Sequence, residues 1–166
     1  MKREIKFRGK DKESGKWIYG AYHKHIDITP CPLGVVDEKH IHHLIIKDGF
    51  SDWNMPRGMD AIKVDSVTVG QFTGLKDKNG KDIYEGDILY SNGQNYDFIQ
   101  VVEFHNTERT SGRGWIGVNH ISIDRKTKEQ TAIEQFSYFS TPCSCIVIGN
   151  IHDNPELLKG GNDVHF

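Results

Sequence analysis

The chain has 166 residues, 36% hydrophobic and 27% charged, which suits one ordinary domain or two very small ones that fold in water. Its 21 lysines and arginines and 23 aspartates and glutamates give a formal net charge of −2, which excludes binding to a polyanion by bulk charge alone. The sequence has neither a segment of roughly 18 apolar residues nor a signal-peptide pattern, so we expect a cytoplasmic protein without a membrane partner. The odd number of cysteines, three, indicates reduced thiols rather than a disulfide scaffold.

Short β-like segments separated by turn residues predict a mainly β fold of small twisted sheets or barrel-like β subunits. The predicted strands lie around Ile5–Phe7 and Trp17–Tyr19, and over Ile41–Lys47, Ala61–Val64, Val67–Phe72, Asp87–Ser91, Phe98–His105, Trp115–Asn119 and Cys145–Ile151. Asn79-Gly80 and Asn92-Gly93 are each expected to close a hairpin, because Asn-Gly favours a type I′ turn. The segment Thr131–Tyr138 fits either two turns of helix or a strand.

One short C-terminal helix is expected over Asn154–Leu158. Asn can cap the first turn, and Pro fits the first helical position. We expect Leu157 and Leu158 to dock this turn on the β core.

Two parts of the chain are similar to each other. Phe7–Gly20 and Phe72–Gly86 both contain an aromatic residue, Gly, Asp-Lys, Gly-Lys, Ile-Tyr and Gly in that order, with small insertions. Either the same hairpin is used twice, or Asp-Lys-x-x-Gly-Lys is simply a common hairpin turn.

The prolines between Thr29 and Asp60 predict an irregular excursion that carries one strand. We therefore expect an N-terminal β subunit over residues 1–60, a main β domain over residues 61–158 and a flexible tail over residues 159–166.

Histidines cluster in the first third of the chain. In a strand, residues two apart share a face, so His23/His25 and His40/His42 can each present two imidazoles to one ion, with Cys31 as a further ligand. The spacing between the pairs matches no known zinc pattern. Exposed histidines on a solvated strand face are therefore the favoured interpretation, and no metal or other cofactor is expected.

No catalytic residue is predicted either. Gly112–Gly117 matches Gly-x-Gly-x-x-Gly but continues as a strand, whereas a dinucleotide site requires a helix there.

The N-terminal arm is basic, because residues 1–16 hold seven lysines and arginines against three acidic residues. With Phe7, Trp17, Tyr19 and Tyr22 nearby, this arm is a candidate surface for single-stranded nucleic acid. The alternative is an exposed edge strand with one buried aromatic face.

Three motifs resemble the YopX family, whose members are small proteins encoded by phages and prophages. They are the opening Arg3–Gly9, the central Thr68–Leu89 and the closing Ile148–Leu158. The resemblance implies a mainly β fold and a phage or prophage origin in a bacterial host cell, and it brings no catalytic residues. The turn residues of the central motif indicate a structural role.

These observations predict a non-enzymatic accessory protein that acts by contact with a protein partner or with itself. Trp53, Met55 and Arg57 are the expected interface residues, because Trp, Met and Arg are enriched in interface cores. The alternatives are a nucleic-acid-associated module that uses the basic arm, and a metal-dependent enzyme that uses His23, His25, His40 and His42.

Overall fold

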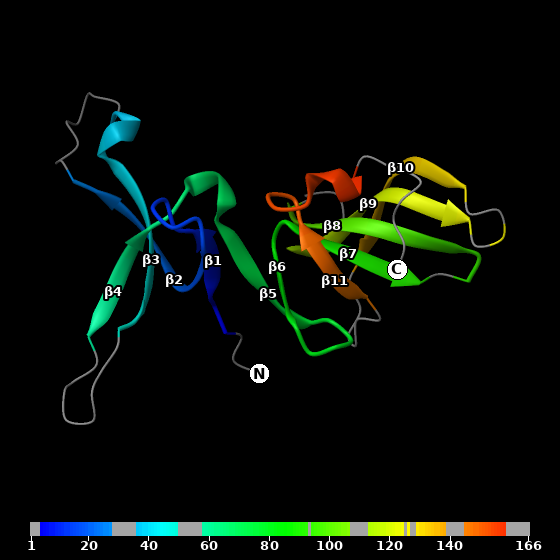
Figure 1. Ribbon diagram of the computed structural model, residues 1–166, viewed down its shortest axis with the longest axis horizontal. Helices are drawn as coiled ribbons and strands as arrows, with labels where there is room; N and C mark the ends of the chain where they lie inside the picture. Colours follow the sequence, from blue (N-terminus) through cyan, green and yellow to red (C-terminus); the bar gives the residue numbers. More distant parts are fainter. Residues whose placement is uncertain are drawn as a thin grey trace. The chain divides into compact units, whose positions relative to one another are not determined.

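A computed structural model describes residues 4–27, 36–49, 58–92, 94–106, 113–124, 126, 129–138 and 145–158. Within these residues the fold is mainly β, as predicted. The strands form two antiparallel sheets, in the orders β4-β3-β2-β1-β5-β6 and β10-β9-β8-β7-β11, and neither sheet closes into a barrel (Figure 1). The only helical segments in the described part are single 3₁₀ turns.

The elements follow one another along the chain as short strands. The first group is β1 (Phe7–Lys10), β2 (Trp17–Ile26), η1 (Glu38–His40), β3 (Ile41–Asp48), β4 (Met59–Lys63), η2 (Ser66–Thr68) and β5 (Gly70–Lys76). The second group is β6 (Asp82–Tyr84), β7 (Asp87–Asn92), β8 (Tyr96–Asn106), β9 (Arg113–Asp124), β10 (Gln130–Tyr138), β11 (Ile146–Asn150) and η3 (Pro155–Leu158).

The chain divides into two compact units, Met1–Gln71 and Phe72–Phe166, with the boundary inside β5. The boundary predicted from the sequence, between residues 60 and 61, lies inside β4. Residues on both sides of that point pair with β3, Asp60 with Lys47 and Ala61 with Ile46. The predicted tail, residues 159–166, lies outside the described residues and stays a prediction.

The sheet of the first unit curls toward one face. After β4 the chain returns to the beginning of the unit, where Val64 forms an isolated bridge with Asp11 and the Asp65 N–H donates to the Lys10 carbonyl at 2.8 Å. β3 also passes so close to β2 that a side chain at Gly20 would collide with the carbonyl oxygen of Ile46. The inner face of the sheet completely buries Val64 and also Ile45, which pairs with Tyr22.

The second unit has apolar clusters formed by neighbouring residues of β7, whose side chains point to opposite faces of its five-stranded sheet. The first cluster consists of Ile83, Leu89, Val102 and Cys145, with Leu75 and Val147 packed against it. The second consists of Ile88, Ile99, Val101 and Ile121, with Ile123, Ile148, Leu157 and Leu158 packed against it. The predicted docking of the two C-terminal leucines is thus confirmed.

The two similar segments form the same kind of hairpin turn. Asp11 and Asp77 each begin a turn in which the side-chain carboxylate accepts hydrogen bonds from backbone N–H groups that follow it. Gly15 and Gly80 adopt φ values of 67° and 84°, the left-handed region that glycine tolerates. The turns join β1 to β2 and β5 to β6, and both strand pairs are antiparallel. The hairpin predicted at Asn79-Gly80 is confirmed.

The central and closing motifs meet through the backbone. The Gly86 N–H donates to Val102, and the carbonyl of Gly86 accepts from the N–H of Ile151, both at 2.9 Å. The buried Asp87 accepts from the Tyr84 N–H at 2.8 Å, which fixes the turn between β6 and β7. The turn residues of these motifs therefore have a structural role.

The hairpin predicted at Asn92-Gly93 is confirmed, because β7 pairs with β8 from Ile88–Val101 to Asn92–Asp97. Two expectations need correction. The C-terminal helix is a 3₁₀ turn, in which the Leu157 N–H donates to the Asn154 carbonyl at 3.1 Å. Cys145 is disulfide-bonded, and its partner lies outside the described residues, so the expectation of three reduced thiols was wrong. An odd count prevents complete pairing but not one pair.

The open alternative for Thr131–Tyr138 is resolved in favour of a strand, because β10 pairs with β9 over most of its length. In the described part of the chain, no helix is long and apolar enough to cross a membrane.

Candidate functional site

The histidines of β2 and β3 separate onto the two faces of the first unit's sheet. His43 lies on the inner face, where its Nδ1 and the Tyr22 hydroxyl share a hydrogen bond of 2.7 Å. His23, His25 and His42 lie on the outer face. The ring centroids of His23 and His25 are 6.0 Å apart, and those of His25 and His42, which pair across the strands, are 6.3 Å apart.

The Asp27 carboxylate is hydrogen-bonded to two of the histidines. The two Asp27 oxygens are hydrogen-bonded to Nδ1 of His40 at 2.8 Å and to Nε2 of His42 at 3.1 Å. The hydrogen bond from His42, followed by that from His40, lowers the pKa of Asp27 below its ordinary value. The Asp27 N–H also donates to the His40 carbonyl at 3.1 Å, so these contacts join the end of β2 to the start of β3.

His25 pairs with His42 across β2 and β3, and Asp27 joins His42 to His40, so these contacts link the two predicted histidine pairs. His40 lies in η1 and not in a strand, so the strand spacing assumed for His40/His42 does not hold. Cys31, the further ligand considered, lies outside the described residues. Within the described ranges, no group of three or more His, Cys, Asp or Glu side chains is placed to hold a metal ion.

The basic arm is divided between the two faces of the sheet. Phe7 packs on Tyr22 of the inner face, with ring centroids 5.5 Å apart. On the outer face, the Arg8 guanidinium lies 4.6 Å and the Lys10 Nζ 5.5 Å from the centre of the Trp17 ring. The interpretation of this arm as an edge strand was wrong, because β1 pairs with both β2 and β5.

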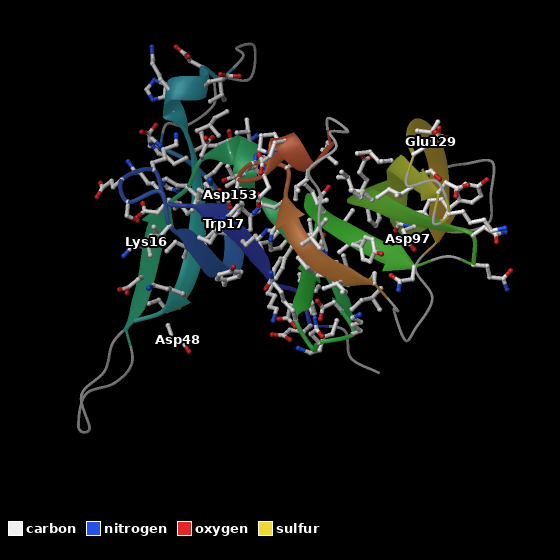
Figure 2. The ribbon with its side chains drawn as sticks, turned by 45° about the vertical axis from the view of Figure 1, so that its right-hand side comes forward. Lys16, Trp17, Asp48, Asp97, Glu129 and Asp153 are labelled. Atoms are coloured by element: carbon white, nitrogen blue, oxygen red, sulfur yellow. The ribbon has the colours of Figure 1, made fainter. Side chains whose placement is uncertain are left out.

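The outer face thus carries residues of both the basic arm and the histidine cluster. We call it the ring-lined face, and it consists of Lys10, Trp17, Tyr19, His23, His25, His42 and Lys63. Tyr19 is 50% exposed, and His23, His25 and Lys63 are exposed as well. Figure 2 labels Trp17 at the start of β2 and Asp48 at the end of β3. The shared face could be predicted from the alternation of side chains along a strand. Which histidine turns inward depends on the strand register.

Trp53, Met55 and Arg57, the interface residues predicted from the sequence, lie outside the described residues, and their role stays a prediction.

The fold and this face define a mainly β protein whose first sheet exposes aromatic and imidazole rings. The model of the YopX protein family matches residues 6–159, and the chain belongs to this family, as its motifs predicted. A crystal structure of protein EF1440 from Enterococcus faecalis is similar, with 22% sequence identity and a TM-score of 0.40 over 95% of this chain and 100% of that chain. No curated protein matches the chain.

Proposed function

We propose that this YopX-family protein is a non-enzymatic accessory protein of a phage or prophage, and that it acts by binding another molecule through the ring-lined face. The observation that carries the proposal is the row of exposed rings on one strand, in which Tyr19 is half-exposed and His23 and His25 follow it on the same face. Solvated sheet faces ordinarily carry polar side chains, and exposed aromatic residues are enriched where partners bind.

The distribution of the core supports a binding role for the first unit. Ile45 and Val64 are the buried hydrophobic residues described in that unit, whereas both described apolar clusters belong to the second unit. The outer face also carries apolar side chains between its rings, because Ala21, Ile46 and Ala61 form one cross-strand row. Contact with a partner would remove this row from water.

The buried carboxylates support the non-enzymatic part of the proposal. Asp77 and Asp87 are the acidic residues buried within the described ranges, and both accept hydrogen bonds from backbone N–H groups that shape turns. A general acid or base needs access to a substrate proton. These two carboxylates have structural tasks instead.

A cross-linking pull-down from host cells tests the proposal. The bait proteins are the wild-type chain, Tyr19→Ala on the ring-lined face, and Tyr96→Ala, which removes a ring of similar exposure (45%) from the second unit. We expect Tyr19→Ala to lose a partner that the wild type and Tyr96→Ala retain, with unchanged melting temperatures for all three. Equal recovery of every partner by all three baits would contradict a role for this face.

The interface predicted from the sequence can be tested in the same experiment. A Trp53→Ala bait that loses the partner without losing stability would extend the contact surface to that part of the chain.

A further inference from the structure

Most rings of the ring-lined face lie in one row along β2. Trp17, Tyr19, His23 and His25 are separated by even numbers of residues on β2, so their side chains share a face. Successive side chains on one face of a strand are about 6.6 Å apart, and the ring centroids of His23 and His25 are 6.0 Å apart. The row from Trp17 to His25 therefore extends over roughly 26 Å.

Positive charge accompanies this row. The Lys10 ammonium lies 5.5 Å from the centre of the Trp17 ring. Lys63 belongs to the row that pairs His23 with Leu44 and Leu44 with Lys63, so it shares the outer face with His23. The nearby carboxylate of Asp27 is hydrogen-bonded to His40 and His42. Lys10 and Lys63 thus lie on the same face as the rings, although the whole chain has a formal charge of −2.

The combination of rings and cations suits one kind of anionic partner, a single nucleic acid strand, better than another, an acidic peptide. An acidic peptide requires cations but offers no planar groups to stack on a row of rings. A single nucleic acid strand offers both a phosphate backbone and unstacked bases, and sheets with exposed aromatic rings bind such strands by stacking. Because stacking is tolerant of sequence, the expected ligand is defined by its single-stranded form rather than by a base order.

We propose that the ring-lined face binds single-stranded nucleic acid, with bases stacked on Tyr19 and the exposed histidines and with phosphates near Lys10 and Lys63. This inference rests on the proposed function, because it names the class of partner for the same face.

The test is fluorescence anisotropy of a labelled dT oligonucleotide of about 12 residues, a length within the known range of single-strand sites. Two matched pairs of variants are compared in the full chain. Tyr19→Ala is paired with Tyr96→Ala, and Lys63→Ala is paired with Lys47→Ala, whose lysine is also exposed but lies on the opposite face of β3. Thermal melting of each variant verifies that it is folded.

We expect Tyr19→Ala to weaken binding about fivefold or more, since base–aromatic stacking is worth about 1–3 kcal/mol. Lys63→Ala should lower the slope of log affinity against log salt by about 0.7, the value for one phosphate contact on a single strand. Tyr96→Ala and Lys47→Ala should bind like the wild type.

The inference is overturned if the wild type does not bind dT, or if each variant of a matched pair has the same effect. A poly-glutamate peptide of equal length provides the second arm. If this peptide binds as tightly as dT, the face recognises acidic chains in general and the nucleic-acid inference fails. A partner captured from nuclease-treated cells through Tyr19 would then still support the proposed function, so the two proposals fail separately.

Discussion

At the scale of single residues, two aspartates at equivalent positions of the two similar segments differ in their exposure to water. Asp11 and Asp77 both cap a hairpin turn, but Asp11 lies in an exposed turn whereas Asp77 is 6% exposed. Asp77 accepts from the backbone N–H groups of Asn79 at 2.8 Å, Lys81 at 2.9 Å and Val147 at 3.1 Å. It therefore joins its turn to β11, some distance further along the chain.

We predict that Asp77→Ala lowers the free energy of unfolding by on the order of 2–4 kcal/mol, because it leaves buried N–H groups without their charged acceptor. Asp11→Ala is the matched control, and it should have a clearly smaller effect because water can replace the carboxylate there. Urea denaturation followed by tryptophan fluorescence measures both. Equal losses from the two substitutions would show that the link to β11 contributes nothing.

Asp77 should also make stability depend on pH. Burial by itself raises the pKa of Asp77, but the N–H donors of Val147, Lys81 and Asn79 outweigh burial and hold the pKa below its ordinary value. A carboxyl group with a lowered pKa in the folded state stabilises the fold above the unfolded-state pKa of about 3.9, and this contribution disappears as the pH falls through the folded-state pKa.

The measurement compares the wild type with Asp77→Asn, which cannot ionise. We expect the difference in their free energies of unfolding to be constant at neutral pH and to shrink as the pH falls below about 4. Exposed aspartates with lowered pKa values, such as Asp27, titrate in both proteins and cancel in the difference. A difference that grows toward low pH would contradict the assignment.

At the scale of elements, the 3₁₀ turn Pro155–Leu158 packs against the second unit through its two leucines. Both leucines are half-buried. Leu157→Ala should therefore cost about 1–2 kcal/mol, somewhat less than a fully buried leucine.

Truncation after Leu158 is the matched change, and it should leave the melting temperature unchanged. Differential scanning calorimetry of the two variants decides the question. A truncated chain that melts as early as Leu157→Ala would show that residues 159–166 contribute to stability.

Most strands were predictable because their signals are local. Short β-like segments between turn residues located β3, β7, β8 and β11, and the turn chemistry of Asn79-Gly80 located the β5–β6 hairpin. The prediction stayed open or incomplete where local sequence patterns favour two structures or become weak. The segment 131–138 suits helix and strand alike, and its pairing with β9 decides for the strand. The sequence also indicated a start for β9 but not its full length to Asp124, because Ser and Asn residues in β9 have low strand propensity.

At the scale of the whole molecule, the two units differ in how much core they bury. The completely buried side chains of the second unit include Ile83, Ile88 and Leu89, whereas those described in the first unit are Ile45 and Val64. Hydrophobic burial is the main favourable contribution to folding. The first unit should therefore open more readily than the second.

Hydrogen–deuterium exchange measured by mass spectrometry tests this expectation. Amides of β2 and β3 should exchange faster than amides of β7 and β8, because local opening depends on the core that each strand covers. Peptides from β9 are not needed for the comparison. Equal protection in the two units would mean that they unfold as a single cooperative body.

The sequence by itself determined the mainly β class, most of the strands, the hairpin at Asn79-Gly80 and the YopX family. Each of these depends on residue alternation, turn chemistry or a motif, which are properties of neighbouring residues. Only the tertiary structure decided that His43 of β3 turns inward, that His25 of β2 lies across from His42 of β3, and that Asp77 holds β11. These features depend on strand register and on the order of strands in a sheet. Both are set by contacts between residues far apart in the chain, such as Asp77 with Val147, which local patterns do not specify.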